Sequence, residues 1–250
     1  MFSFYRSAGR AFAAGLPMFL ALAVLMEAFG LFTSDGRRDS GATFVAGALV
    51  AYLLHRHLLL GERAWGASKG TQQRPAGMGR FMLVSAALLG VPIVTAFPLV
   101  FHLAKQGVPE NTIVVAYVFA VMVLYLVMLS LFGTMLPASA VREPFGLGLT
   151  LARARRTFLP IFVGLVVGPG LFSVLLLAVA TWLHASFGFP LDAYERTGAF
   201  DALGFAGGAL MRLGGLLSTT LAVAVLCNAY RRVVPPGAPA GGTDEIAVTG

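Results

Sequence analysis

The chain has 250 residues, of which 58% are hydrophobic and only 12% are charged, and its mean hydropathy is +0.82. Soluble domains carry about 25% charged residues, so this composition argues against a water-soluble fold. The formal charge of +7 does not indicate nucleic-acid binding, because the basic residues lie at the ends of apolar segments and not along one polar face.

Six apolar segments follow one another along the chain. A helix rises about 1.5 Å per residue, so about 20 apolar residues are needed to cross a hydrocarbon core about 30 Å thick. The segments that reach this length are Arg10–Thr33, Ala42–Leu60, Phe81–His102, Thr112–Leu136, Pro160–His184 and Gly204–Ala229. We therefore predict an all-α, polytopic membrane protein with six transmembrane helices within residues 1–232. Residues 233–250, rich in Pro and Gly, are predicted to form a disordered cytoplasmic tail.

Two charged residues lie inside the predicted spans, Glu27 in the first and Arg212 in the sixth. A lone charge at mid-bilayer costs roughly 2.5 to 3.5 kcal/mol on insertion scales, so such residues usually face protein or water. Counted along their helices, both fall in the outer half of the bilayer at similar depth. We predict an intramembrane ion pair between them. Two alternatives remain open: Arg212 extends its side chain out of the membrane, or the two charges line a pathway for protons or anions.

The segment Phe145–Phe158 between the fourth and fifth spans is amphipathic. Its apolar residues recur at helical spacing: Leu147, Leu151, Ala154 and Phe158. Its basic residues follow the polar side: Arg153, Arg155 and Arg156. We predict a short interfacial helix on the inner membrane surface, with these three arginines contacting lipid headgroups. Topological anchoring without specific lipid contacts is the alternative.

Small residues recur at a spacing that favours close helix packing. Gly164 and Gly168 form one such pair, and Gly204 and Gly208 form another. We predict that both pairs pack helices within the chain, with dimerisation or docking to another membrane protein as the alternatives. Four prolines interrupt the spans and are predicted to kink them: Pro17, Pro92, Pro98 and Pro169.

The distribution of Lys and Arg among the loops predicts the orientation. Thirteen basic residues belong to the termini and the loops on one side, and four belong to the loops on the other. By the positive-inside rule, both termini are predicted to be cytoplasmic. Because arginine greatly outnumbers lysine and Ala and Gly are abundant, a GC-rich bacterial genome is indicated, and hence the inner membrane of a bacterium.

The run Leu136–Gly168 has a recognisable order of features: a Leu-Pro, an aliphatic stretch, an acid, an amphipathic segment ending in basic residues, and a new span. This order resembles bacterial six-helix membrane proteins of unknown function, and is similar to the membrane domain associated with glycerophosphodiester phosphodiesterases. The matching positions are Pro137, Glu143, Arg153 and Arg156. Arg and Thr residues stand where that family has Trp or Ser, and the resemblance implies an architecture more than an activity.

No catalytic, cofactor or metal motif is recognised in the sequence. His55 and His57 are two residues apart and point to different sides of a helix, which is poor geometry for one metal ion. We predict a non-enzymatic protein that scaffolds, assembles or regulates a membrane complex or lipid environment. Its expected partners are membrane lipids and another integral membrane protein or a second copy, and not nucleic acid. A small transporter or channel using Glu27 and Arg212 is the alternative, followed by a lipid-modifying enzyme.

Overall fold

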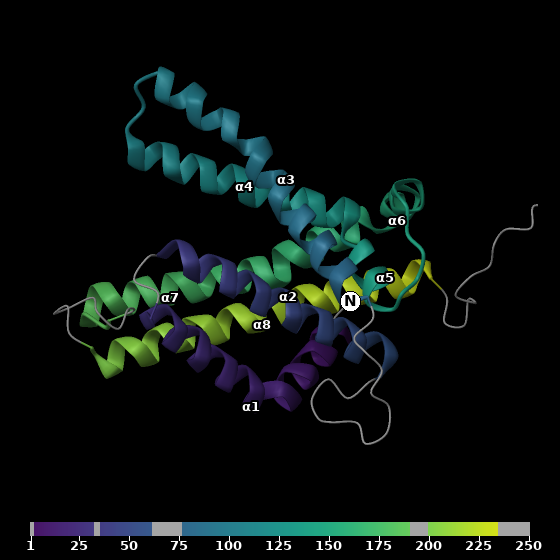
Figure 1. The fold of residues 1–250 in the computed structure, drawn as a ribbon, viewed down its shortest axis with the longest axis horizontal. Helices are drawn as coiled ribbons and strands as arrows, with labels where there is room; N and C mark the ends of the chain where they lie inside the picture. The colour runs from purple at the N-terminus through teal and green to yellow at the C-terminus, as the bar shows by residue number, and fades with distance from the viewer. Residues whose placement is uncertain (1–2, 33–35, 62–76, 191–199, 235–250) are drawn as a thin grey trace, which may run out of the picture. The chain divides into compact units, whose positions relative to one another are not determined.

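The structure, a computed structural model, describes residues 3–32, 36–61, 77–190 and 200–234. All of its regular elements within these ranges are helical (Figure 1): α1 (Ser3–Phe32), α2 (Gly36–Leu60), α3 (Met78–Lys105), α4 (Glu110–Phe132), α5 (Met135–Ala140), α6 (Leu147–Leu165), the π-helical turn η1 (Val166–Gly170), α7 (Leu171–Phe187) and α8 (Ala202–Val233). In this described part of the chain, six helical stretches are long and apolar enough to cross a membrane, which confirms the all-α class and the six predicted candidate spans. The predicted disordered tail lies outside the described residues from residue 235 onward.

The chain divides into two compact units, which are described separately. Unit 1 consists of residues 1–72 and 163–225, and unit 2 consists of residues 73–162 and 226–250. Unit 1 therefore contains α1, α2, η1, α7 and most of α8. Unit 2 contains α3, α4, α5, most of α6 and the last two turns of α8.

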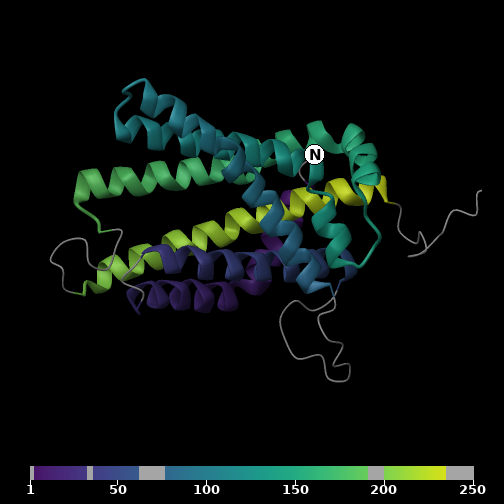
Figure 2. The same ribbon diagram turned by 45° about the horizontal axis from the view of Figure 1, so that its top comes forward.

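Unit 1 is built around helices that run alongside one another. Helices α1 and α2 pack side by side, as Figure 2 shows at the purple end of the colour scale. Their fully buried side chains include Phe19 of α1 and Tyr52 and Leu54 of α2. The side chain of Leu176 in α7 lies against Gly214 in α8, so α7 also packs against α8. Phe19 and Tyr52 are thus buried inside the unit, whereas Trp182 and Phe187 and many aliphatic side chains are exposed.

Unit 2 is built on a hairpin formed by α3 and α4, which pack against each other on the side of the turn that joins them (Figures 1 and 2). The turn between them includes Gly107 with a φ of 72°, a left-handed conformation that glycine adopts without strain. The short helix α5 packs against α3, and all of its residues from Leu136 to Ala140 are buried. The exposed residues of α4 lie in its first half, up to Val123, as expected where a helix faces lipid.

The fourth predicted span differs from the structure at its end. The sequence predicts one helix up to Leu136, whereas α4 ends at Phe132 and α5 begins at Met135. At the break, Gly133 packs so closely that a Cβ there would lie 2.6 Å from Cδ2 of Leu226. A residue without a side chain at this position lets Leu226 of α8 lie against the backbone where α4 ends.

The predicted short helix between the fourth and fifth spans is also different in extent. The structure has one helical stretch of 41 residues, Leu147–Phe187, in which α6, η1 and α7 follow without interruption. Pro160 lies inside α6 and Pro169 inside η1, so neither proline ends the helix. Proline removes one backbone donor, and neighbouring groups or a local π turn can satisfy the freed carbonyls.

The π turn η1 lies at one of the four prolines that the sequence predicts to be kink sites. Ser218 of α8 donates a hydrogen bond to the carbonyl oxygen of Pro169 at 3.4 Å, and its Oγ lies 2.9 Å from Oγ of Ser173. A polar side chain of a neighbouring helix thus reaches the backbone where the regular α pattern is interrupted. The other three prolines, Pro17, Pro92 and Pro98, lie within α1 and α3.

Candidate functional site

In unit 1 the two intramembrane charges lie together. The Nε atom of Arg212 in α8 donates to Oε2 of Glu27 in α1 at 2.6 Å, and its Nη1 donates to Oγ1 of Thr43 in α2 at 3.3 Å. The side chains are 20% and 12% exposed for Arg212 and Glu27, respectively. A short, charge-assisted bond in a mostly buried setting is stronger than a bond between neutral groups. The cluster therefore ties three helices of this unit together.

The ion pair depends on a glycine in α8. A Cβ at Gly208 would lie 2.9 Å from Oε2 of Glu27 and closer still to other atoms of its carboxyl group. Real Cβ atoms essentially never approach other atoms below 3.0 Å, so any side chain at this position would displace Glu27. Gly208 thus creates the space that the carboxylate occupies.

The other glycines of the predicted packing pairs also lie against side chains or are buried. A Cβ at Gly164 would lie 2.8 Å from Cγ1 of Val225, and one at Gly168 would lie 3.1 Å from Cε1 of Tyr5. Gly204 is buried in α8. At Gly164, Gly168 and Gly208, the group that lies against the helix backbone is therefore a side chain. The spacing alone predicts that two helix backbones meet at these positions.

In unit 2 a tight turn after α5 places an acidic side chain. Arg142 has a φ of 65°, the left-handed conformation that glycine usually supplies after a helix. The N–H of Glu143 donates to the carbonyl of Ala138, and the N–H of Arg142 donates to the carbonyl of Ser139. These two bonds form a Schellman motif, which reverses the chain and orients Glu143 away from α5.

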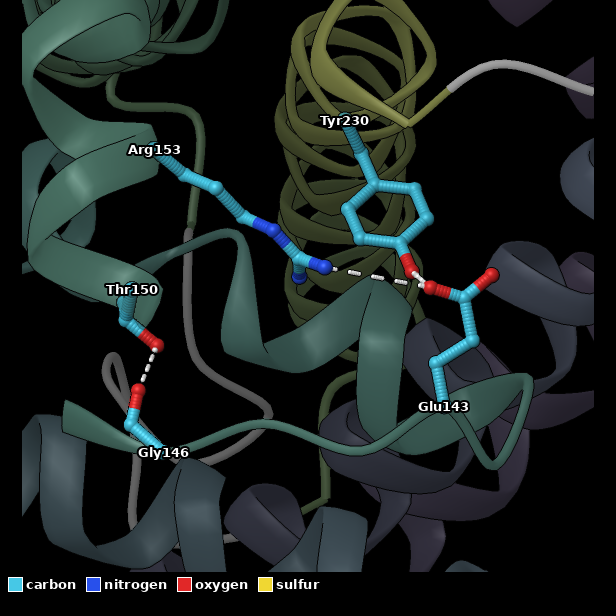
Figure 3. A network of polar contacts seen from close by, with 5 residues as sticks. All are labelled: Glu143, Gly146, Thr150, Arg153 and Tyr230. Carbon is cyan, nitrogen blue, oxygen red and sulfur yellow. Dashed lines mark hydrogen bonds and ion pairs between the residues drawn. The ribbon is translucent and has the colours of Figure 1, made fainter. Parts of the chain in front are cut away.

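Glu143 is the centre of a three-residue network (Figure 3). The hydroxyl of Tyr230 in α8 donates to Oε2 of Glu143, and Nη2 of Arg153 in α6 lies 4.0 Å from the same oxygen. The guanidinium carbon of Arg153 also lies 5.3 Å from the centre of the Tyr230 ring. Exposed fractions are 11% for Arg153 and 23% for Glu143. Three segments of this unit thus meet at a largely buried carboxylate.

Two further contacts fix the segment that carries Glu143. The guanidinium carbon of Arg80, in the first turn of α3, lies 3.8 Å from the centre of the Phe145 ring. Oγ1 of Thr150 donates to the carbonyl of Gly146 at 2.9 Å, as Figure 3 also shows. The turn is therefore held against the start of α3 and against the first turn of α6.

The three arginines predicted to contact lipid headgroups have different surroundings. Arg153 is largely buried and engaged with Glu143 and Tyr230, whereas Arg155 and Arg156 are exposed. The buried residues of α6 include Thr150, Ala154, Thr157 and Ile161. Of the apolar residues that define the predicted amphipathic face, Leu147 and Leu151 are exposed. The exposed side of α6 therefore carries both leucine and arginine.

Sequence reasoning finds some of these residues and misses others. It picks out Glu27 and Arg212 because charges are rare within apolar spans, but nothing in the sequence indicates Thr43 as a third member. Glu143 and Arg153 are noted only as positions of a family resemblance. The signal that could have found Glu143 is its isolation, because it is a lone acid in a stretch otherwise rich in arginine.

Comparisons with family models, with curated proteins and with solved structures found no match. Among the residues that the structure describes, no group of three or more His, Cys, Asp or Glu side chains could hold a metal ion.

Proposed function

We propose that this chain is a non-enzymatic, multi-pass protein of a bacterial inner membrane that assembles or regulates a membrane complex or its lipid environment. The observation that carries this proposal is the exposed side of α6, where Leu151, Arg155 and Leu159 follow one another at intervals of four residues. Apolar and cationic side chains on one exposed face are typical of helices that lie at a lipid headgroup layer.

The length of the α6–α7 stretch supports an interfacial position for the first part of α6. Its 41 residues would extend about 60 Å at 1.5 Å per residue, about twice the hydrocarbon thickness. A part of it must therefore lie outside the hydrocarbon or run along its surface. The part that carries Arg155 and Arg156 is the better candidate for the surface, because α7 is strongly apolar.

The use of polar groups within the spans favours a structural role for them. Glu27, Thr43 and Arg212 bond to one another, and Ser173 bonds to Ser218. Polar groups that hold helices together stabilise a scaffold and do not need a transported solute. The resemblance of the run Leu136–Gly168 to bacterial six-helix membrane proteins agrees with this assignment.

The proposal is tested by purifying the full chain from its native membrane in a mild detergent and quantifying what accompanies it. We expect anionic lipid, another integral membrane protein or a second copy at fixed stoichiometry. Solute flux in proteoliposomes that disappears in Glu27→Gln would instead support the transporter alternative. Recovery of the chain in the supernatant without detergent would overturn the membrane assignment altogether.

Orientation is tested separately by reporters fused to either terminus. We propose that both termini are cytoplasmic, because the arginine-rich segments Arg153–Arg156 and Arg231–Arg232 belong to one end of unit 2. A cytoplasmic reporter should be active at both ends. Activity of a reporter that works only in the periplasm would reverse the orientation.

A further inference from the structure

Arginines gather at one end of unit 2. Helix α3 begins there, α6 begins there and α8 ends there, as the contacts of Arg80 with Phe145 and of Tyr230 with Glu143 require. Seven arginines belong to these segments: Arg80, Arg142, Arg153, Arg155, Arg156, Arg231 and Arg232. Glu143 is the acid that accompanies them among the described residues, so the formal charge of this end is +6.

One arginine of this set is much less exposed than the others. Arg153 is 11% exposed and lies between Glu143 and Tyr230, so its charge is largely balanced within the protein. The other six are exposed, and we call them the arginine cluster: Arg80, Arg142, Arg155, Arg156, Arg231 and Arg232. Arg153 is thus a positioning residue that fixes α6 against α8, while the cluster presents its charge outward.

Apolar residues stand directly beside the cluster. On α6, Leu151 is 46% exposed and Leu159 is 66% exposed, and Arg155 lies between them on the same side of the helix. An acidic soluble partner would match the arginine but leave two leucines in water. An apolar partner would leave the guanidinium without an anion. A membrane surface with negative headgroups satisfies both requirements, because acyl chains and phosphates lie within a few ångströms of each other.

We propose that the arginine cluster binds the phosphate groups of anionic phospholipids, with Leu151 and Leu159 inserted at the level of the acyl chains. This inference rests on the proposed membrane location of the chain and adds the chemical class of the lipid. Guanidinium groups suit this ligand because their planar donors match phosphate oxygens in pairs. Anionic lipid would then hold the ends of α3, α6 and α8 at the surface, where the Glu143 network joins them.

The experiment uses the full chain reconstituted in nanodiscs that contain phosphatidylcholine and phosphatidylglycerol. After transfer to detergent, mass spectrometry gives the ratio of the two lipids retained on the protein. We expect wild type to enrich phosphatidylglycerol, and each arginine removed in Arg155→Gln/Arg156→Gln to lower this enrichment roughly fivefold. Arg155→Lys/Arg156→Lys keeps the charge and should retain most of the enrichment.

Lys105→Gln is the matched control, because Lys105 is an exposed cation at the opposite end of α3. It should leave the lipid ratio unchanged. Inorganic phosphate added during the transfer distinguishes a headgroup within a bilayer from a free anion. The inference is overturned if Arg155→Gln/Arg156→Gln enriches phosphatidylglycerol like wild type, if Lys105→Gln lowers the enrichment equally, or if phosphate at low concentration displaces the lipid.

The outcomes also separate this inference from the proposed function. A chain that is integral to the membrane, assembles with a partner and retains both lipids equally would contradict the lipid inference alone. Helicity and size-exclusion profiles confirm that each variant is folded before its lipid ratio is read. If the double glutamine variant is poorly folded, Arg155→Gln and Arg156→Gln are measured one at a time, and each should lower the enrichment roughly fivefold.

Discussion

Gly208 of α8 lies against the carboxyl group of Glu27 in α1 so closely that a side chain in place of its hydrogen would displace that group. The contact joins a small residue of one helix to an intramembrane charge of another, and Arg212, one turn further along α8, bonds to the same carboxylate. The steric and electrostatic requirements of this cluster can be tested independently.

Gly208→Ala should lower the free energy of unfolding of the full chain in detergent by about 1 to 3 kcal/mol, because the new methyl group displaces Glu27. Gly215→Ala is the matched control. It lies in the same helix, and a Cβ there would meet nothing within 4 Å, so the higher helix propensity of alanine should leave stability equal or raise it by up to about 1 kcal/mol. Equal effects of the two substitutions in thermal unfolding would contradict the steric role of Gly208.

The pair of Glu27 and Arg212 is tested by a double-mutant cycle with Glu27→Gln and Arg212→Ala. Each single substitution leaves the partner charge in a mostly buried place and should destabilise the protein by about 2 to 4 kcal/mol. The double variant should lose less than the sum of the two, with a coupling of about 1 to 3 kcal/mol. Additive losses in thermal unfolding would show that the two side chains act independently.

Tyr230→Phe should destabilise the chain by about 1 to 3 kcal/mol, because it removes a donor from the Glu143 carboxylate, and bonds to charged groups are the stronger ones. Tyr117→Phe makes the same chemical change where the hydroxyl donates to the neutral carbonyl of Ile93 in an exposed place. Its loss should be about 1 kcal/mol or less. The measurement is the difference between the two unfolding midpoints, and a larger loss for Tyr117→Phe would contradict the importance of the network.

Arg142→Gly tests the strained turn after α5. The left-handed conformation costs a residue with a side chain about 1 to 2 kcal/mol. Glycine avoids this cost, but part of the gain in stability is lost because glycine makes the unfolded chain more flexible. Arg142→Ala removes the same side chain and keeps the strain, so it serves as the reference. We expect the glycine variant to be more stable than the alanine variant by about 1 kcal/mol. The opposite order in chemical or thermal unfolding would mean that the turn is not strained.

Much of the fold follows from hydropathy, whereas the partners of individual side chains do not. The six candidate spans are visible because a bilayer requires long apolar helices, and the similar depth of Glu27 and Arg212 can be counted along those helices. The participation of Thr43 and the space at Gly208 depend on how three helices rotate about their own axes. Hydropathy carries no information on that rotation.

The network in unit 2 is hard to foresee for a different reason. Glu143 and Tyr230 are separated by 87 positions. The left-handed residue in the turn before Glu143 is an arginine, and only a glycine there would have indicated this conformation from the sequence. The extent of α6 differs from the prediction because proline normally marks a helix end. In this chain Pro160 and Pro169 lie within continuous helical structure.

The π turn at Val166–Gly170 has a consequence for insertions and deletions in this region. A π turn accommodates one residue more than an α turn, and successive residues of a helix are about 100° apart around its axis. Removing a single residue from the turn would therefore restore regular α geometry and leave the side chains of α7 facing as they do. Removing one from the regular part of α6 would instead rotate every side chain of α7 by that angle, and Ser173 would then face away from Ser218. The length of this segment, and not only its composition, therefore decides which face α7 presents to α8.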